Sequence, residues 1–132
     1  MSMEKKSFEI KAEGINDKGE FVGLASVYGN EDLDKDIIQK GAFTKSLTKY
    51  KSEVVMLWQH KTDSPIGKFL LTDTDKGLEA MGFLNLEVEK GREAFALLKQ
   101  GALKGMSIGF ITKDAEFGSD GYTRLIKEVD LK

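Results

Sequence analysis

The chain has 132 residues, of which 40% are hydrophobic and 32% charged, and its 20 basic and 22 acidic residues give a net charge of −2. This composition indicates one folded domain and excludes the basic field that nucleic acid or an anionic membrane would require, so we expect neither partner. The absence of cysteine excludes disulfides and thiolate chemistry, the single histidine excludes a multi-histidine metal site, and no apolar run approaches the ~20 residues that cross a bilayer.

Two strands are predicted near the N-terminal end, over residues 7–12 and 20–28. Residues 7–12 alternate apolar with polar residues, which is the period of a half-buried strand, and residues 20–28 resume as a strand. Turn-forming residues fill the stretch 14–19 between them. The spacing predicts that these two strands pair as a hairpin.

A polar loop with four acidic residues follows at 29–36. Asp32, Asp34 and Asp36 raise the alternative of a calcium-binding module. An EF-hand loop that began at Asp32 would need glycine at its sixth position and glutamate at its twelfth, and here these positions hold isoleucine and phenylalanine. A solvated loop without metal is therefore the favoured interpretation.

A helix is predicted over 41–51, because Phe43, Leu47 and Tyr50 share one stripe at helical spacing. The nearly continuous apolar run at 53–58 is typical of a central strand that is buried on both sides.

Two further strands are predicted at 66–72 and 78–86, then an amphipathic helix at 88–100 with Gly101 at its C-terminal cap. The last two strands are predicted at 105–112 and 122–131.

The expected architecture is mainly β with helices: about seven strands and two helices. Hairpin-like spacing favours an antiparallel sheet that is closed or nearly closed into a barrel. We expect residues 1–132 to form a single domain. Because the chain ends on an amphipathic strand without a polar tail, we also expect the natural protein to continue beyond it.

His60 is the one side chain available for histidine-dependent general-base chemistry. It follows the apolar strand 53–58, at the point where the chain leaves the core. An imidazole at such a rim is partly desolvated and still reachable, as a base for a serine must be. A structural or surface histidine is the alternative interpretation.

Ser107 lies in the stretch Gly-Met-Ser-Ile-Gly at 105–109. Glycine two positions away on each side would leave its hydroxyl uncrowded. The letters match the nucleophile elbow of α/β-hydrolases, but that elbow needs a strand before the serine and a helix after it. Here the predicted order is reversed, which disfavours an esterase. A serine in a glycine-containing strand remains the alternative.

Three blocks of the sequence together resemble the prohead protease family of tailed bacteriophages. They are GLASVYGNEDLDKDIIQKGAFTKSL at 23–47, VVMLWQHKTDSPIGKF at 54–69 and GREAFALLKQGALKGMSIGF at 91–110. The blocks occur in the family's order and span most of the chain. The resemblance implies a herpesvirus assemblin-like fold, a Greek-key-like barrel flanked by helices.

The same resemblance implies a serine endopeptidase in which Ser107 is the nucleophile and His60 its base. Such enzymes cleave capsid or scaffolding protein during prohead maturation, usually cut themselves, and need neither metal nor organic cofactor. The expected location is the immature prohead in the cytoplasm of a bacterial host. A homodimer is expected by analogy with the assemblins. The alternative is a catalytically inactive structural module that keeps the protease fold.

Assemblin-like enzymes have a third catalytic residue on a strand downstream of the serine. We expect this residue to lie beyond Lys132, and Asp63, Glu128 and Asp130 are the candidates within the chain. Loss of the orienting acid of a triad typically lowers turnover by ~10⁴.

Overall fold

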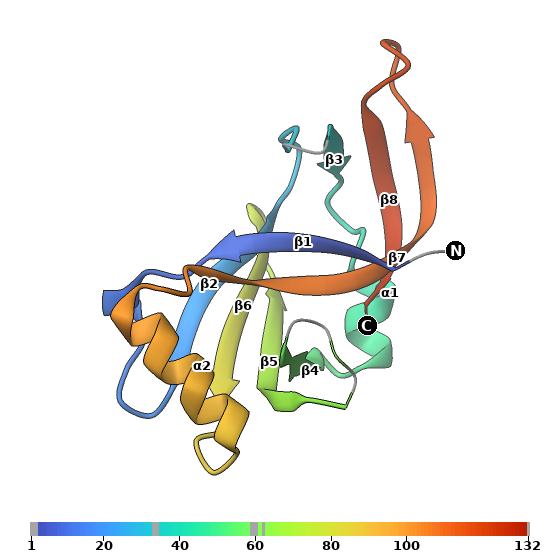
Figure 1. Ribbon diagram of the computed structural model, residues 1–132. Helices are drawn as coiled ribbons and strands as arrows, with labels where there is room; N and C mark the ends of the chain where they lie inside the picture. Colours follow the sequence, from blue (N-terminus) through green and yellow to red (C-terminus); the bar gives the residue numbers. More distant parts are fainter. Residues whose placement is uncertain (1–2, 33–34, 59–60, 62, 132) are drawn as a thin grey trace.

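The computed structural model describes residues 3–32, 35–58, 61 and 63–131 (Figure 1). This part of the chain is mostly β with a few helices, as predicted. Its elements are β1 (Glu4–Glu9), the 3-10 helix η1 (Ala12–Gly14), β2 (Glu20–Val27), β3 (Asp36–Ile38), α1 (Thr44–Lys49), β4 (Glu53–Leu57), β5 (Pro65–Asp73), β6 (Gly77–Leu84), α2 (Glu89–Gln100), β7 (Gly105–Phe117) and β8 (Arg124–Leu131).

The strands form two four-stranded sheets, with the orders β1-β7-β8-β3 and β2-β6-β5-β4. All pairs are antiparallel except β3 with β8, which is parallel. A closed antiparallel barrel of seven strands is therefore not confirmed. The short strand β3 was not predicted, because its three residues follow directly on the acidic loop and are too few to show a period.

The predicted hairpin between the first two strands is wrong. β1 pairs with β7, in a register that runs from Glu4 opposite Phe110 to Glu9 opposite Gly105. The connection to β2 contains η1 rather than a tight turn, so the chain passes over β2 instead of folding back beside it. Figure 1 shows β1 and β7 running together across the strands of the other sheet.

The prediction that residues 53–58 form a central strand buried on both sides is also wrong. β4 is an edge strand that pairs only with β5. Met56 is fully buried, whereas the neighbouring Val55 is 58% exposed. A continuous apolar run does not distinguish the two situations, because alternate residues of an edge strand still point into the core.

One hydrophobic core is shared by the two sheets and the helices. Phe69 of β5 receives two edge-on aromatic contacts, from Phe8 at 6.0 Å and from Phe21 at 6.2 Å between ring centroids. Such pairs add about 0.5–1.5 kcal/mol beyond the area they bury. The rings therefore join β1, β2 and β5 across the two sheets.

Both predicted helices are present, α2 with nearly the predicted bounds and α1 with about half of the predicted length. α2 ends at Gln100, and Gly101 adopts the left-handed conformation at φ 84°, as the glycine cap required. α1 is shorter than the predicted range, but Phe43 and Leu47 of its stripe are buried. In the described part of the chain, neither helix has the length and apolar character that crossing a bilayer demands.

Candidate active site

Ser107 lies near the start of β7 and is half-buried. Because side chains alternate along a strand, Gly105, Ser107 and Gly109 belong to one face of β7, and Met106 and Ile108 belong to the other. Met106 and Ile108 pack in the core. The serine is thus directed to the opposite face, between two positions that carry no side chain.

Gly105 is required by the packing of β1. A Cβ at this position would come within 2.3 Å of the main-chain oxygen of Phe8, so no larger residue fits without a backbone shift. From the sequence, the expected role of this glycine is to leave the Ser107 hydroxyl uncrowded. The structure adds a second reason, since the glycine lets β1 approach the strand that carries Ser107.

Ser107 borders two hollows of very different size. The larger one has a volume of ≈ 350 Å³ and is lined, among the described residues, by Ser7, Leu57, Trp58, Leu103, Gly105, Met106 and Ser107. The smaller one, of ≈ 10 Å³, lies where β4 approaches β7 and is lined by Val54, Val55, Leu57, Phe69, Ser107, Ile108, Gly109 and Leu131. We call the larger hollow the serine pocket. The smaller one has room for about one water molecule.

His60, the predicted base, lies outside the described residues. Gln59 and Thr62 also lie outside them, whereas Trp58 and Lys61 are described. Trp58, two positions earlier, lines the serine pocket. Its N–H donates to the carbonyl oxygen of Ser64 at 2.9 Å, and its own carbonyl accepts from the N–H of Lys61 at 2.9 Å. The connection between β4 and β5 therefore leaves the sheet at the pocket that Ser107 borders.

A buried charge network lies at the other end of β1. The Asp36 carboxylate, 4% exposed, accepts two hydrogen bonds from Arg124, at 2.9 and 3.0 Å, and one from Lys6 at 2.6 Å. Lys6 also pairs with Asp32 at 2.8 Å, and Arg124 pairs with Glu4. These contacts join β1, β3, β8 and the acidic loop.

The network lowers the pKa of two carboxyl groups. Burial raises the pKa of Asp36, but the hydrogen bonds from Arg124 and Lys6 outweigh it and leave the pKa below the ordinary 3.8. For Glu4, the hydrogen bond from Arg124 is the main cause of a pKa below the ordinary 4.5. Both groups are therefore ionised and held by cations at neutral pH.

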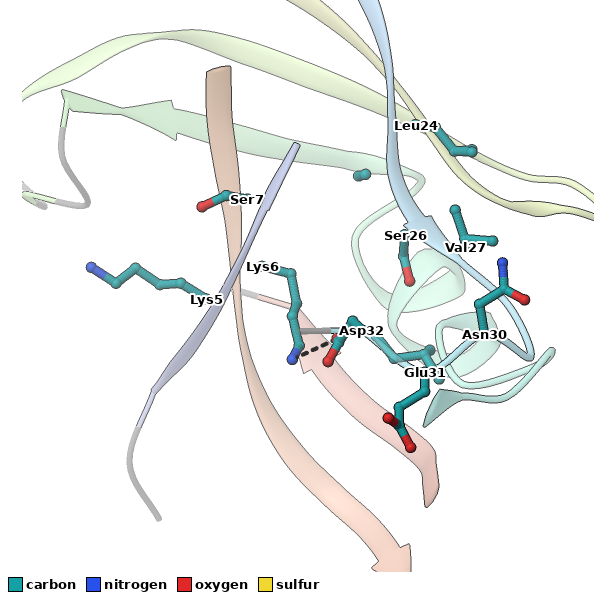
Figure 2. A pocket seen from close by; sticks show the side chains of 11 residues that line it. Lys5, Lys6, Ser7, Leu24, Ser26, Val27, Asn30, Glu31 and Asp32 are labelled. Carbon is teal, nitrogen blue, oxygen red and sulfur yellow. Dashed lines mark ion pairs between the residues drawn. The ribbon is translucent and has the colours of Figure 1, made fainter. Parts of the chain in front are cut away.

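A second pocket, of ≈ 470 Å³, lies beside this network (Figure 2). Figure 2 shows Lys6 and Asp32 facing each other in it, while the Ser7 side chain points to the other side of β1. Among the described residues, no group of three or more histidine, cysteine or acidic side chains has the geometry to hold a metal ion. Asp34, the third acid of the calcium alternative, lies outside the described residues.

A family model described as caudovirus prohead serine protease matches residues 6–132. The chain belongs to the caudovirus prohead serine protease family.

Curated members of this prohead protease family are similar to the chain over most of its length. The prohead protease of Enterobacteria phage HK97 is 39% identical over 109 residues, which are 80% of this chain and 48% of that protein. The prohead protease of Escherichia phage T5 is 34% identical over 107 residues, 77% of this chain and 49% of that protein. The chain spans about half the length of these two relatives.

Two further similarities are to a capsid polyprotein and to a capsid assembly protease. The capsid polyprotein of Pseudomonas phage PAJU2 is 32% identical over 117 residues, 83% of this chain and 16% of the polyprotein. The solved structure of the bacteriophage T4 capsid assembly protease has a TM-score of 0.74 at 11% identity, over 99% of this chain and 93% of the T4 chain. At this identity the similarity shows a shared fold.

The three candidates for a third catalytic residue lie in different surroundings in this prohead protease family member. Asp130 accepts hydrogen bonds from Ser46 at 3.5 Å and from Tyr50 at 3.3 Å, and so is tied to α1. Glu128 pairs with Lys45 at 3.3 Å, also on α1. Asp63 is exposed in the connection between β4 and β5. These contacts of Glu128 and Asp130 give both residues a role in holding α1 against β8.

Sequence reasoning missed most of the walls of the serine pocket. Trp58 precedes His60 by two positions at the end of an apolar run, and that position was the one available signal. Ser7, Leu103 and Met106 carried no signal, because Ser7 reaches the site through the pairing of β1 with β7, which connects residues about a hundred positions apart.

Proposed function

We propose that this chain is the catalytic domain of a serine endopeptidase in which Ser107 is the nucleophile and His60 the general base. One observation carries the proposal: Ser107 borders a pocket whose wall includes Leu57 and Trp58, the residues that lead into Gln59 and His60. Membership of a serine protease family supports the same assignment.

In this mechanism, neutral His60 accepts the hydroxyl proton of Ser107 as the serine oxygen attacks a peptide carbonyl carbon. The C–N bond of the tetrahedral intermediate then breaks, and the imidazolium gives its proton to the leaving amine. Water hydrolyses the acyl-enzyme with the same imidazole as base. The steps need no metal or organic cofactor.

The proposed substrate is a capsid or scaffolding protein, cleaved inside the immature prohead in the host cell. The prohead proteases of phages HK97 and T5 and the capsid polyprotein of phage PAJU2 support this substrate class. We further propose self-cleavage and a homodimeric active form. Wild-type and Ser107→Ala proteins, compared by intact mass and by sedimentation, test these two points.

Labelling with a fluorophosphonate tests the catalytic assignment. We expect incorporation at Ser107 in the wild-type chain and none in Ser107→Ala or His60→Ala. Ser119→Ala is the matched control, because Ser119 is an exposed serine in the turn between β7 and β8 and its loss should not alter labelling.

A catalytically inactive structural module is the competing function. If neither this chain nor a version with the full length of the HK97 and T5 proteases incorporates the probe, the endopeptidase assignment is wrong and the structural module replaces it.

A further inference from the structure

We propose that the serine pocket is the subsite for an uncharged, apolar side chain of the substrate next to the scissile bond, with Trp58 as its principal wall. The inference rests on the proposed function, and it adds the chemical class that the site accepts.

The first argument is the composition of its walls. Among the described residues that line the pocket, Leu57, Trp58, Leu103 and Met106 are apolar, and Ser7 adds one neutral hydroxyl. None of the described residues that line the pocket is charged. These described residues offer no counter-ion to a charged substrate side chain, and loss of hydration without a counter-ion is unfavourable by several kcal/mol in general.

The second argument is size. At ≈ 350 Å³ the pocket falls within the ~300–1,000 Å³ of ordinary ligand sites. The other hollow beside Ser107 measures ≈ 10 Å³, because Val54 and Val55 of β4 lie close to Ile108 and Leu131. Of these two spaces at the serine, the serine pocket alone has room for a substrate side chain.

The third argument is the charge beside the Trp58 ring. The Lys90 ammonium of α2 lies 5.7 Å from the centroid of the Trp58 ring. This cation opposes the approach of a lysine or arginine side chain to that wall. An acidic side chain is thus the strongest competitor of an apolar one, and the test must include it.

The experiment compares three peptidyl phosphonates that differ at one position: acetyl-Ala-Ala-X diphenyl phosphonate with X as leucine, glutamate or lysine. We expect the leucine probe to label Ser107 about tenfold or more faster than the other two. Leu103→Glu should transfer the preference to the lysine probe. Leu24→Glu is the matched control: Leu24 is 43% exposed on β2 and does not line the pocket, so the preference for leucine should remain.

A second measurement detects binding without a covalent reaction, and it does not depend on whether Leu103→Glu folds. Trp58 is the only tryptophan in the chain, so intrinsic fluorescence reports directly on the pocket wall. In Ser107→Ala, acetyl-Ala-Ala-Leu amide should change the emission in a saturable manner, and the lysine analogue should have a much smaller effect.

The outcomes separate this inference from the proposed function. Labelling of Ser107 at equal rates by all three probes, with no emission change for the leucine peptide, would overturn the subsite and leave the endopeptidase assignment intact. Saturable binding of the leucine peptide to Ser107→Ala, without any labelling of the wild-type chain, would support the subsite and contradict the endopeptidase assignment.

Discussion

Ser7 and Ser107 lie directly opposite each other in the register of β1 and β7, and both border the serine pocket. Opposed residues of an antiparallel pair have Cβ atoms ~4.5–5.5 Å apart. The N-terminal strand therefore forms part of the rim around the proposed nucleophile, although it is a hundred positions away in the sequence.

A larger side chain at position 7 should obstruct the serine. We expect Ser7→Tyr to slow fluorophosphonate labelling of Ser107 about tenfold, roughly 1.4 kcal/mol of activation free energy. Ser7→Ala should label at the wild-type rate, because the smaller residue leaves the pocket open. Labelling rates measured by mass spectrometry, together with melting curves for both variants, check this. Equal rates for all three proteins would remove Ser7 from the rim.

Gly105→Ala should destabilise the fold by about 1–3 kcal/mol, because the added Cβ would lie 2.3 Å from the Phe8 main-chain oxygen and β1 must shift. Gly14→Ala is the matched control, since a Cβ there has no atom within 4 Å. Urea denaturation gives the free energies of unfolding. If the urea midpoint of Gly105→Ala equals that of the wild-type chain, β1 does not approach β7 as closely as described.

Some of this arrangement could be predicted from sequence and some could not. The ranges of β2, β5, β6 and α2 follow from local apolar periodicity and from glycine-containing turns, and the predictions agree with the structure within about two residues at each end. The strand partners do not follow from local pattern. β1 could pair with β2 or with β7, and the choice depends on packing between residues far apart in the chain, such as Phe8 against Phe69.

The candidate site divides in the same way. The glycines around Ser107 and the place of His60 after an apolar run made both residues candidates, and their predicted roles followed from the resemblance to the prohead protease family. The charge network around Asp36 was not predicted, because Lys6, Arg124 and Glu4 come from opposite ends of the chain. The acidic loop raised calcium only as an alternative, and Asp32 and Asp36 are paired with cations of the protein.

The Asp36 network should make stability sensitive to acid. The folded-state pKa values of Asp36 and Glu4 lie below the ordinary 3.8 and 4.5. The two carboxylates therefore contribute fully to the free energy of unfolding at pH values above these ordinary pKa values. It is lost as the pH falls through the lower folded values, because the unfolded state then binds more protons. Urea titrations from pH 7 to pH 3 should show a decline that becomes smaller in Asp36→Asn.

Asp36→Asn should lower the free energy of unfolding by about 3 kcal/mol at pH 7, because it leaves Arg124 and Lys6 without their shared carboxylate. Asp17→Asn serves as the control: the Asp17 side chain is fully exposed and pairs with Lys99 at the surface, so its loss should be nearly neutral. Equal effects of the two substitutions would contradict the structural role of the network.

The most direct test of the central claim uses the single imidazole of the chain. His60 should give one set of ring resonances in an NMR titration, with a midpoint that moves when Ser107 is phosphonylated, because the modified oxygen no longer donates a proton to the ring and places a new group beside it. An imidazole that titrates identically before and after modification of Ser107 would show that the two side chains do not meet, and would contradict the account.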